Sequence, residues 1–245
     1  MEEVKHMKKP LAYILTAGLA VSLIASGTIY AEEPANSNAT VNFTAPDDPV
    51  GPVDPTDPTQ PNTDSPEDNG IITGQNGPLS LDYVSHLDFG NQEISTSEEI
   101  YSSETTEPYI QVTDLRGSGE GWDVTAEVSN FISDEDGTVS LPSSSIQLNN
   151  GDTVSTSESA NPVVPASINL VTGGDSTTVV SAASRVAEEP VNTAQGLGTW
   201  VTRWLAGEGN TENGNVTLTV PGSTATAGSH TATITWTLET GPTGE

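Results

Sequence analysis

Alternation of apolar and polar residues at every second position is the feature that most constrains the fold of this chain. In the stretch TATITWTLE (231–239), Thr or Glu occupies each odd position and an apolar residue occupies each even position. Successive side chains of a β-strand point to opposite faces of the sheet, so a period of two fits a strand with one buried face. The stretches GWDVTAEVSNF (121–131) and NVTLTVP (215–221) repeat the pattern. These segments predict an all-β protein.

Shorter segments of the same kind lie between clusters of Gly, Asn, Asp and Ser, which are residues that favour turns. Many short strands separated by turns predict an antiparallel β-sandwich or barrel-like domain. The segment AASRVAEE (182–189) is the one stretch that we predict as a short helix. The weaker predicted strands are 79–84, 108–114, 138–142, 146–150, 167–172 and 177–183.

The first 31 residues have the composition of a secretory signal peptide. Lys5, Lys8 and Lys9 form a basic start, an apolar run covers 11–27, and the sequence Ile-Tyr-Ala ends at Ala31. This order is typical of an export signal that is cleaved after a small residue. A retained membrane anchor is the alternative interpretation, because the apolar run is slightly long. We predict cleavage after Ala31, so that residues 1–31 are lost and the remaining chain has no membrane contact.

Residues 32–76 form a second zone, in which Asp-Pro recurs at short intervals. Proline removes backbone donors and biases the preceding residue toward extended conformations, and the acids repel one another. We therefore predict a disordered, extended spacer over 32–76. The folded β domain is predicted to cover 77–245.

The composition excludes several classes of function. Loss of residues 1–31 leaves three arginines against 32 acidic residues, a formal net charge of −29. Such a chain repels nucleic acid and anionic membranes at long range. Cysteine is absent, which excludes thiol catalysis, thiolate-bound zinc and iron–sulfur clusters.

Two Trp-x-apolar triplets lie on predicted strands and are the main candidate binding residues. They are Trp122-Asp123-Val124 and Trp236-Thr237-Leu238. Both tryptophans alternate in phase with apolar neighbours, which favours a place in the core. A surface-accessible binding face is the alternative, because a partly exposed Trp is a strong anchor at interfaces.

A second candidate platform lies in GTWVTRWL (198–205). Alternation places Trp200 and Trp204 on one strand face, and Arg203 lies beside them in the sequence. An aromatic pair next to a guanidinium group suits a ligand platform. The other interpretation is a segment packed on the rim of the sandwich.

These triplets and their surroundings resemble the WxL domain of Gram-positive surface proteins. The resemblance covers nearly the whole chain and includes the signal and the Asp-Pro spacer. The chain departs from the family pattern at Val124, where Leu is usual, and at Asp123, where Thr or Ser is usual. The matching blocks are 77–95 (GPLSLDYVSHLDFGNQEIS), 109–131 (YIQVTDLRGSGEGWDVTAEVSNF), 198–205 (GTWVTRWL) and 216–242 (VTLTVPGSTATAGSHTATITWTLETGP).

The resemblance implies non-covalent attachment to the peptidoglycan wall at the cell surface, without catalysis, and a role for companion surface proteins. The terminal LETGPTGE has no LPxTG-type sorting signal, which favours attachment by binding. The alternative is a structural or adhesin subunit that is held by companion proteins or binds host matrix. No catalytic residue, metal site or cofactor is predicted. The acidic turn 134–137 lacks the bidentate Glu of a calcium loop, since Ser145 occupies that position.

Overall fold

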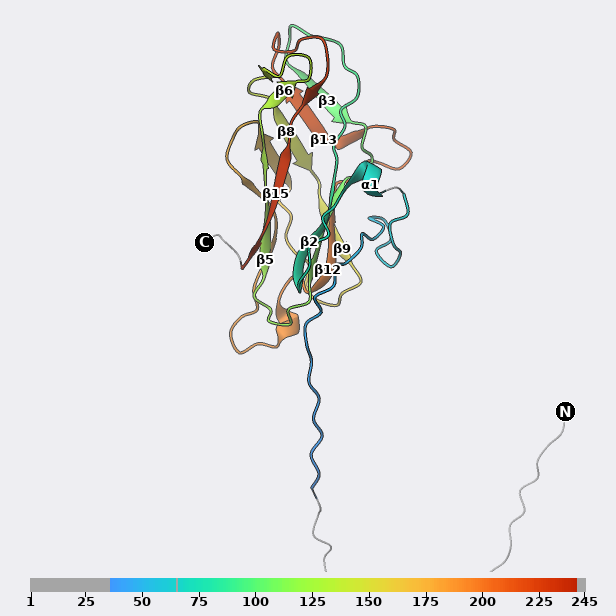
Figure 1. Ribbon diagram of the computed structural model, residues 1–245, viewed down its shortest axis with the longest axis vertical. Coiled ribbons are helices and arrows are strands. Elements are labelled where there is room, and N and C mark those ends of the chain that lie inside the picture. The colour runs from blue at the N-terminus through green and yellow to red at the C-terminus, as the bar shows by residue number, and fades with distance from the viewer. Residues whose placement is uncertain (1–35, 65, 242–245) are drawn as a thin grey trace, which may run out of the picture. The chain divides into compact units, whose positions relative to one another are not determined.

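The computed structural model describes residues 36–64 and 66–241, and the predicted signal peptide lies outside them. The chain divides into two units, residues 1–42 and residues 43–245. In the described part of the first unit, 36–42, no residue belongs to a helix or strand. The second unit is built almost entirely of antiparallel strands (Figure 1), which confirms the predicted fold class.

Three larger sheets and one small sheet make up this unit. A five-stranded sheet has the order β1 (Gly70–Ile72), β2 (Leu79–Ser85), β4 (Tyr109–Asp114), β12 (Gly198–Arg203) and β9 (Asp152–Ser155). A four-stranded sheet has the order β10 (Ser167–Val171), β8 (Ser145–Asn149), β13 (Asn213–Val220) and β3 (Glu99–Ser103). The third sheet, here called the motif sheet, has the order β11 (Thr177–Ala182), β5 (Trp122–Val128) and β15 (Ile234–Thr240).

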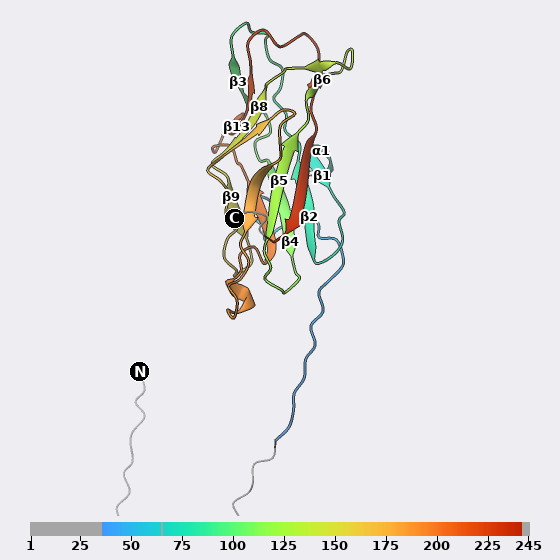
Figure 2. The same ribbon diagram turned by 90° about the vertical axis from the view of Figure 1, so that its left-hand side faces the viewer.

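The remaining elements are short. The small sheet contains β14 (His230–Thr231), β6 (Phe131–Ser133) and β7 (Val139–Ser140). The helix α1 (Pro66–Asn69) precedes β1, and a 3₁₀ turn, η1 (Val191–Thr193), precedes β12. All three larger sheets contribute side chains to one hydrophobic core, and β5 and β15 lie side by side in front of β2 and β4 (Figure 2).

The predicted helix over 182–189 is wrong. Strand β11 continues through Ala182, whose side chain is fully buried in the core, and the following residues form turns. Glu188 has a positive φ of 70°, which a helix does not allow. The Arg185 guanidinium donates to the Glu189 carbonyl oxygen and closes this turn without helical bonds.

The segment 51–62, here called the strap, corrects the predicted extent of the spacer. The Gln111 side chain accepts a hydrogen bond from the Val53 amide (2.8 Å) and donates to the Gly51 carbonyl oxygen (3.0 Å). Asn62 donates to the Tyr109 hydroxyl oxygen at 2.8 Å. Strand β1 follows the strap and pairs with β2. Ordered packing therefore begins well before residue 77, and the disorder predicted for 32–76 does not reach residue 76.

The strap covers a second, smaller cluster on the outer side of the five-stranded sheet. Tyr83 and Tyr109 stack with their ring centroids 4.4 Å apart, Val201 joins them, and Val53 packs against this cluster. The composition of the strap predicts disorder because it is acidic and proline-rich. Its acids instead close local turns, as when Asp54 accepts from the amides two and three residues later.

Candidate functional site

The two tryptophan triplets lie on neighbouring strands of the motif sheet. Their antiparallel register pairs Val124 with Leu238, and it pairs Ala126 with Trp236. The triplets therefore form one continuous patch across β5 and β15, although more than a hundred residues separate them in the sequence. Sequence periodicity assigns each triplet to a strand, and only the register shows that they are adjacent.

Trp122 is fully buried and structural. Its indole nitrogen donates to the Gly196 carbonyl oxygen at 3.1 Å. A Cβ at Gly196 would lie 2.7 Å from that nitrogen, and the φ of +70° also favours glycine there. Trp122 therefore presents no surface to a ligand and holds the loop before β12 against the sheet.

A half-buried arginine holds the chain just before Trp122. Arg116 forms a two-point contact with the Asp114 carboxylate, at 2.9 and 2.8 Å, and donates to the Gly121 carbonyl oxygen at 2.7 Å. Hydrogen bonding to Asp114 raises the pKa of Arg116 further above its ordinary value. The guanidinium of Arg116 therefore stays charged and positions the entry into β5.

The two departures from the usual motif have different positions. Val124 is fully buried against Leu238, so a branched apolar side chain serves the packing at this place. Asp123 points to the other side of β5, is only 3% exposed, and accepts a hydrogen bond from the Ser181 hydroxyl. Asp123 thus links β5 to β11.

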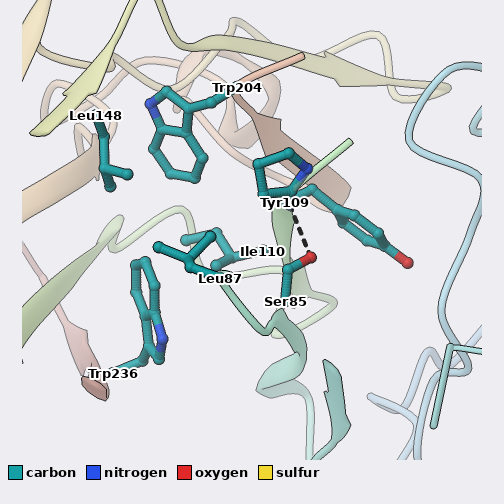
Figure 3. Close-up of a pocket in the computed structure, with 8 residues that line it drawn as sticks. Ser85, Leu87, Tyr109, Ile110, Leu148, Trp204 and Trp236 are labelled. Carbon is teal, nitrogen blue, oxygen red and sulfur yellow. Dashed lines mark hydrogen bonds between the residues drawn. The ribbon is translucent and has the colours of Figure 1, made fainter. Parts of the chain in front are cut away.

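Trp236 and Leu238 are half-buried because β15 is an edge strand. Trp236 lines one side of a small apolar cavity of about 10 Å³, and Trp204 lines the opposite side (Figure 3). Leu87 and Ile110 lie between the two indoles. A volume of this size is close to that of one water molecule, so the cavity cannot take a sugar ring.

The outer face of the motif sheet carries hydroxyl and carboxylate groups. One row across the three strands consists of Thr178, Thr125 and Thr237, of which the first and last are exposed. A second row pairs Glu127 with Thr235, and both are exposed. We call this set of five residues the hydroxyl face.

The sequence analysis did not identify the hydroxyl face as a candidate site. Two residues of the triplets nevertheless lie in it or next to it. Asp123 and Thr237 both lie on this side of the sheet. The sequence does place threonines at the polar positions of each strand. Without the strand order, that pattern did not show that the threonines form one row.

The predicted platform of Trp200, Arg203 and Trp204 does not form. The two tryptophans share one strand face, as predicted, but each is only 2% exposed and belongs to the main core. Arg203 lies on the opposite face of β12, where it bonds Asp152 through two nitrogens at 3.0 Å each and also donates to the Pro55 carbonyl oxygen. Its guanidinium therefore fastens the strap and does not stack on either indole.

The described parts of the chain contain neither a metal-ligand cluster nor a membrane-spanning helix. Over 36–64 and 66–241, no three His, Asp or Glu side chains are grouped so as to hold a metal ion. The acidic turn predicted at 134–137 is present, and Asp136 accepts hydrogen bonds from the Thr138 amide and hydroxyl. None of the helices in these two stretches has the length and apolar composition needed to span a membrane.

Comparison with known proteins gives one match. A family model described as WxL domain surface cell wall-binding matches residues 31–242, which is most of the chain. Neither the curated proteins nor the solved structures contain a match to this chain. The matched region includes both triplets, the strap and the whole hydroxyl face.

Proposed function

The chain belongs to the WxL domain surface cell wall-binding family, and on this premise we propose that it binds the peptidoglycan of a Gram-positive wall without covalent attachment. The proposal includes export by residues 1–31 and the absence of catalysis. The family match is the observation that carries it. The match spans 31–242 and includes the β domain, which supports assigning the binding function to that domain.

We place the wall contact on the hydroxyl face. Trp122 and Val124 are fully buried and Leu238 is half-buried, so these motif residues support the sheet from its inner side. Glycan chains of peptidoglycan offer hydroxyl and acetamido groups in a regular row. Threonine hydroxyls both donate and accept hydrogen bonds, and carboxylates accept them. An ordered row of such groups on the face of a sheet suits an extended polysaccharide.

The charge of the chain favours short-range contacts of this kind. At a formal net charge of −28, the protein is repelled at long range by anionic wall polymers such as teichoic acids. Hydrogen bonds act only at contact, and each contributes about 0.5–1.5 kcal/mol net. Several together give useful affinity, and many copies of the glycan repeat add avidity.

The test is co-sedimentation of residues 32–245 with purified Gram-positive walls, before and after removal of teichoic acid. The informative variant carries Thr125→Val, Thr178→Val and Thr237→Val, which remove three hydroxyls and keep the branched shape. We expect its affinity for walls to fall about tenfold or more. The matched control carries Thr217→Val and Thr219→Val on β13 and should bind like the wild type.

The outcomes separate the parts of the proposal. Equal binding by the triple variant and the wild type would move the contact away from the hydroxyl face. Absence of wild-type binding would overturn autonomous attachment and favour a complex subunit held by companion proteins. Release of soluble glycan fragments from the walls would overturn the non-catalytic assignment. Stronger binding after teichoic acid removal is expected from the charge.

A further inference from the structure

The outer edge of β15 carries unpaired backbone groups. At its two ends, Thr233 accepts from the Ser129 amide and the Gly241 amide donates to Gly121, both toward β5. Hydrogen bonding alternates along an antiparallel strand, so the amides and carbonyls of Ile234, Trp236 and Leu238 point away from β5. No other strand of the described residues pairs with this edge, as the strand order of the motif sheet shows.

This edge lacks the features that usually prevent strand addition. Natural proteins protect long edge strands with proline, charged residues, bulges or a covering segment. Strand β15 has seven residues in regular register without proline. From Asn213 to Leu238 the sequence contains no Asp, Glu, Lys or Arg, although the whole chain has a net charge of −28. Glu239, near the C-terminal end, is the one charged residue of β15, so the edge from Ile234 to Leu238 is uncharged and suited to contact.

A second uncharged stretch, near the start of the described chain, has the alternating pattern of a β-strand. Residues 34–46 contain no charged side chain, and within them Ala39, Val41, Phe43 and Ala45 alternate with polar residues. This is the period of a half-buried strand. Yet Val41 is 69% exposed and Phe43 is 89% exposed. The stretch is not assigned to any strand of the described residues, so a strand-like sequence is left without a sheet.

We propose that residues 39–45 of one copy add as a β-strand to the β15 edge of a second copy of this chain. The added strand would supply partners to the free backbone groups of Ile234, Trp236 and Leu238. Its apolar side chains would pack beside the half-buried Trp236, and its threonines would extend the hydroxyl face. This is strand addition to an exposed sheet edge, in which main-chain bonds give affinity and alternate side chains give specificity.

The symmetry of the contact determines what kind of assembly results. Each copy has one donor stretch and one acceptor edge, and these are different surfaces. Association is therefore head-to-tail, and it gives rings if the rotation closes or open chains if it does not. The donor stretch joins the folded unit at Asp47, whose carbonyl oxygen accepts from the Gly77 amide at 3.2 Å.

Sedimentation of residues 32–245 in an analytical ultracentrifuge, at about 1–100 μM and about 0.15 M salt, tests this proposal. We expect the mass to rise with concentration above that of the monomer. Val41→Asp with Phe43→Asp should weaken self-association at least about tenfold, because two carboxylates would have to be desolvated beside Trp236. Asn36→Asp with Ser37→Asp adds the same charge outside the strand and serves as the matched control.

Residue-resolved hydrogen exchange identifies the acceptor edge. In the associated wild type, the amides of Ile234, Trp236 and Leu238 should be protected, and they should lose this protection in the Val41→Asp, Phe43→Asp protein. A wild type that stays monomeric with these amides exposed overturns the proposal, as does association that survives the double substitution. A monomer with protected amides would mean that the strand adds to its own chain, which overturns the second copy as partner. An associated protein with exposed amides would exclude β15.

Discussion

At the scale of single residues, Trp122 and Trp236 occupy equivalent places in their triplets but differ in burial. Trp122 is surrounded on all sides and its indole nitrogen is satisfied by Gly196. Trp236 lies on an edge strand and keeps part of its ring exposed. The tryptophan of the first triplet therefore serves stability, whereas the tryptophan of the second triplet is partly available for contact.

Substitution of each tryptophan measures this difference. Trp122→Ala should lower the free energy of unfolding by about 3–5 kcal/mol, because it empties a fully buried site. Trp236→Ala should cost clearly less, since its ring is already partly in water. Urea unfolding followed by circular dichroism gives both values. Equal losses would show that Trp236 is as deeply packed as Trp122.

Asp82 is a buried carboxylate on the five-stranded sheet. It is 2% exposed, and its oxygens accept hydrogen bonds from Ser80, Gln111 and Thr113. Burial raises the pKa of Asp82 above its ordinary value, and the three hydrogen bonds only partly offset that effect. The folded protein therefore holds a proton on Asp82 at a pH where the unfolded chain has already lost it.

The sign of the pH dependence follows from linkage. Because the folded-state pKa is raised, the contribution of Asp82 to stability is larger at low pH and declines as pH rises through that pKa. The difference in unfolding free energy between the wild type and Asp82→Asn should therefore shift in favour of the wild type from neutral pH to about pH 4.5. Urea titrations at both pH values measure it, and a constant difference would contradict a raised pKa.

At the scale of elements, the strap shows that an acidic, proline-rich segment can be part of a folded domain. The Gln111 side chain pairs with the strap backbone at Gly51 and Val53 in the manner of an additional strand. Arg203 donates to the Pro55 carbonyl oxygen from the neighbouring strand. Two polar side chains on β4 and β12 thus hold a segment that has little apolar surface of its own.

Removal of the strap should destabilise the domain. Without residues 32–63, the cluster of Tyr83, Tyr109 and Val201 loses its cover, and Gln111 loses its backbone partners. We expect a loss of about 2–4 kcal/mol in unfolding free energy, from both apolar exposure and unpaired polar groups. The control lacks only residues 32–42 and should unfold like the longer protein. Equal stability of both shortened proteins would mean that the strap covers the sheet without stabilising it.

At the scale of the whole molecule, the scarcity of positive charge is the dominant electrostatic property. Arg116 binds Asp114, Arg203 binds Asp152, and Arg185 donates to the carbonyl oxygens of Ser118 and Glu189. Every arginine of the chain is thus engaged in holding loops or the strap. The three arginines thus bind groups of the folded unit, and the formal charge of the chain is strongly negative.

Salt should therefore strengthen association of this protein with anionic material. Raising the salt concentration from about 0.02 M to about 0.15 M shortens the screening length to about 8 Å and reduces repulsion between negative surfaces. We expect the fraction that sediments with teichoic-acid-bearing walls to increase over this range. Walls stripped of teichoic acid should show a smaller change. A decrease with salt would indicate attraction by local positive charge.

The period-two pattern was sufficient to predict several strands, including β5, β13 and β15, and with them the fold class. This is because side-chain alternation is a local property of the backbone. The same alternation predicted that the side chains of Trp122 and Val124 point into the core. Segment 182–189 was misassigned because its local helix propensity was outweighed by burial of Ala182 in the core.

Tertiary structure alone decided how far each side chain is buried and which strands are neighbours. The sequence shows that Trp236 is in phase with apolar residues, but its partial exposure follows from the edge position of β15. Arg203 is adjacent to Trp204 in sequence and faces the other way in the sheet. The packing of the strap depends on Gln111, which lies 58 residues after its partner Val53 in the sequence. Such contacts join distant segments, and local periodicity carries no information about them.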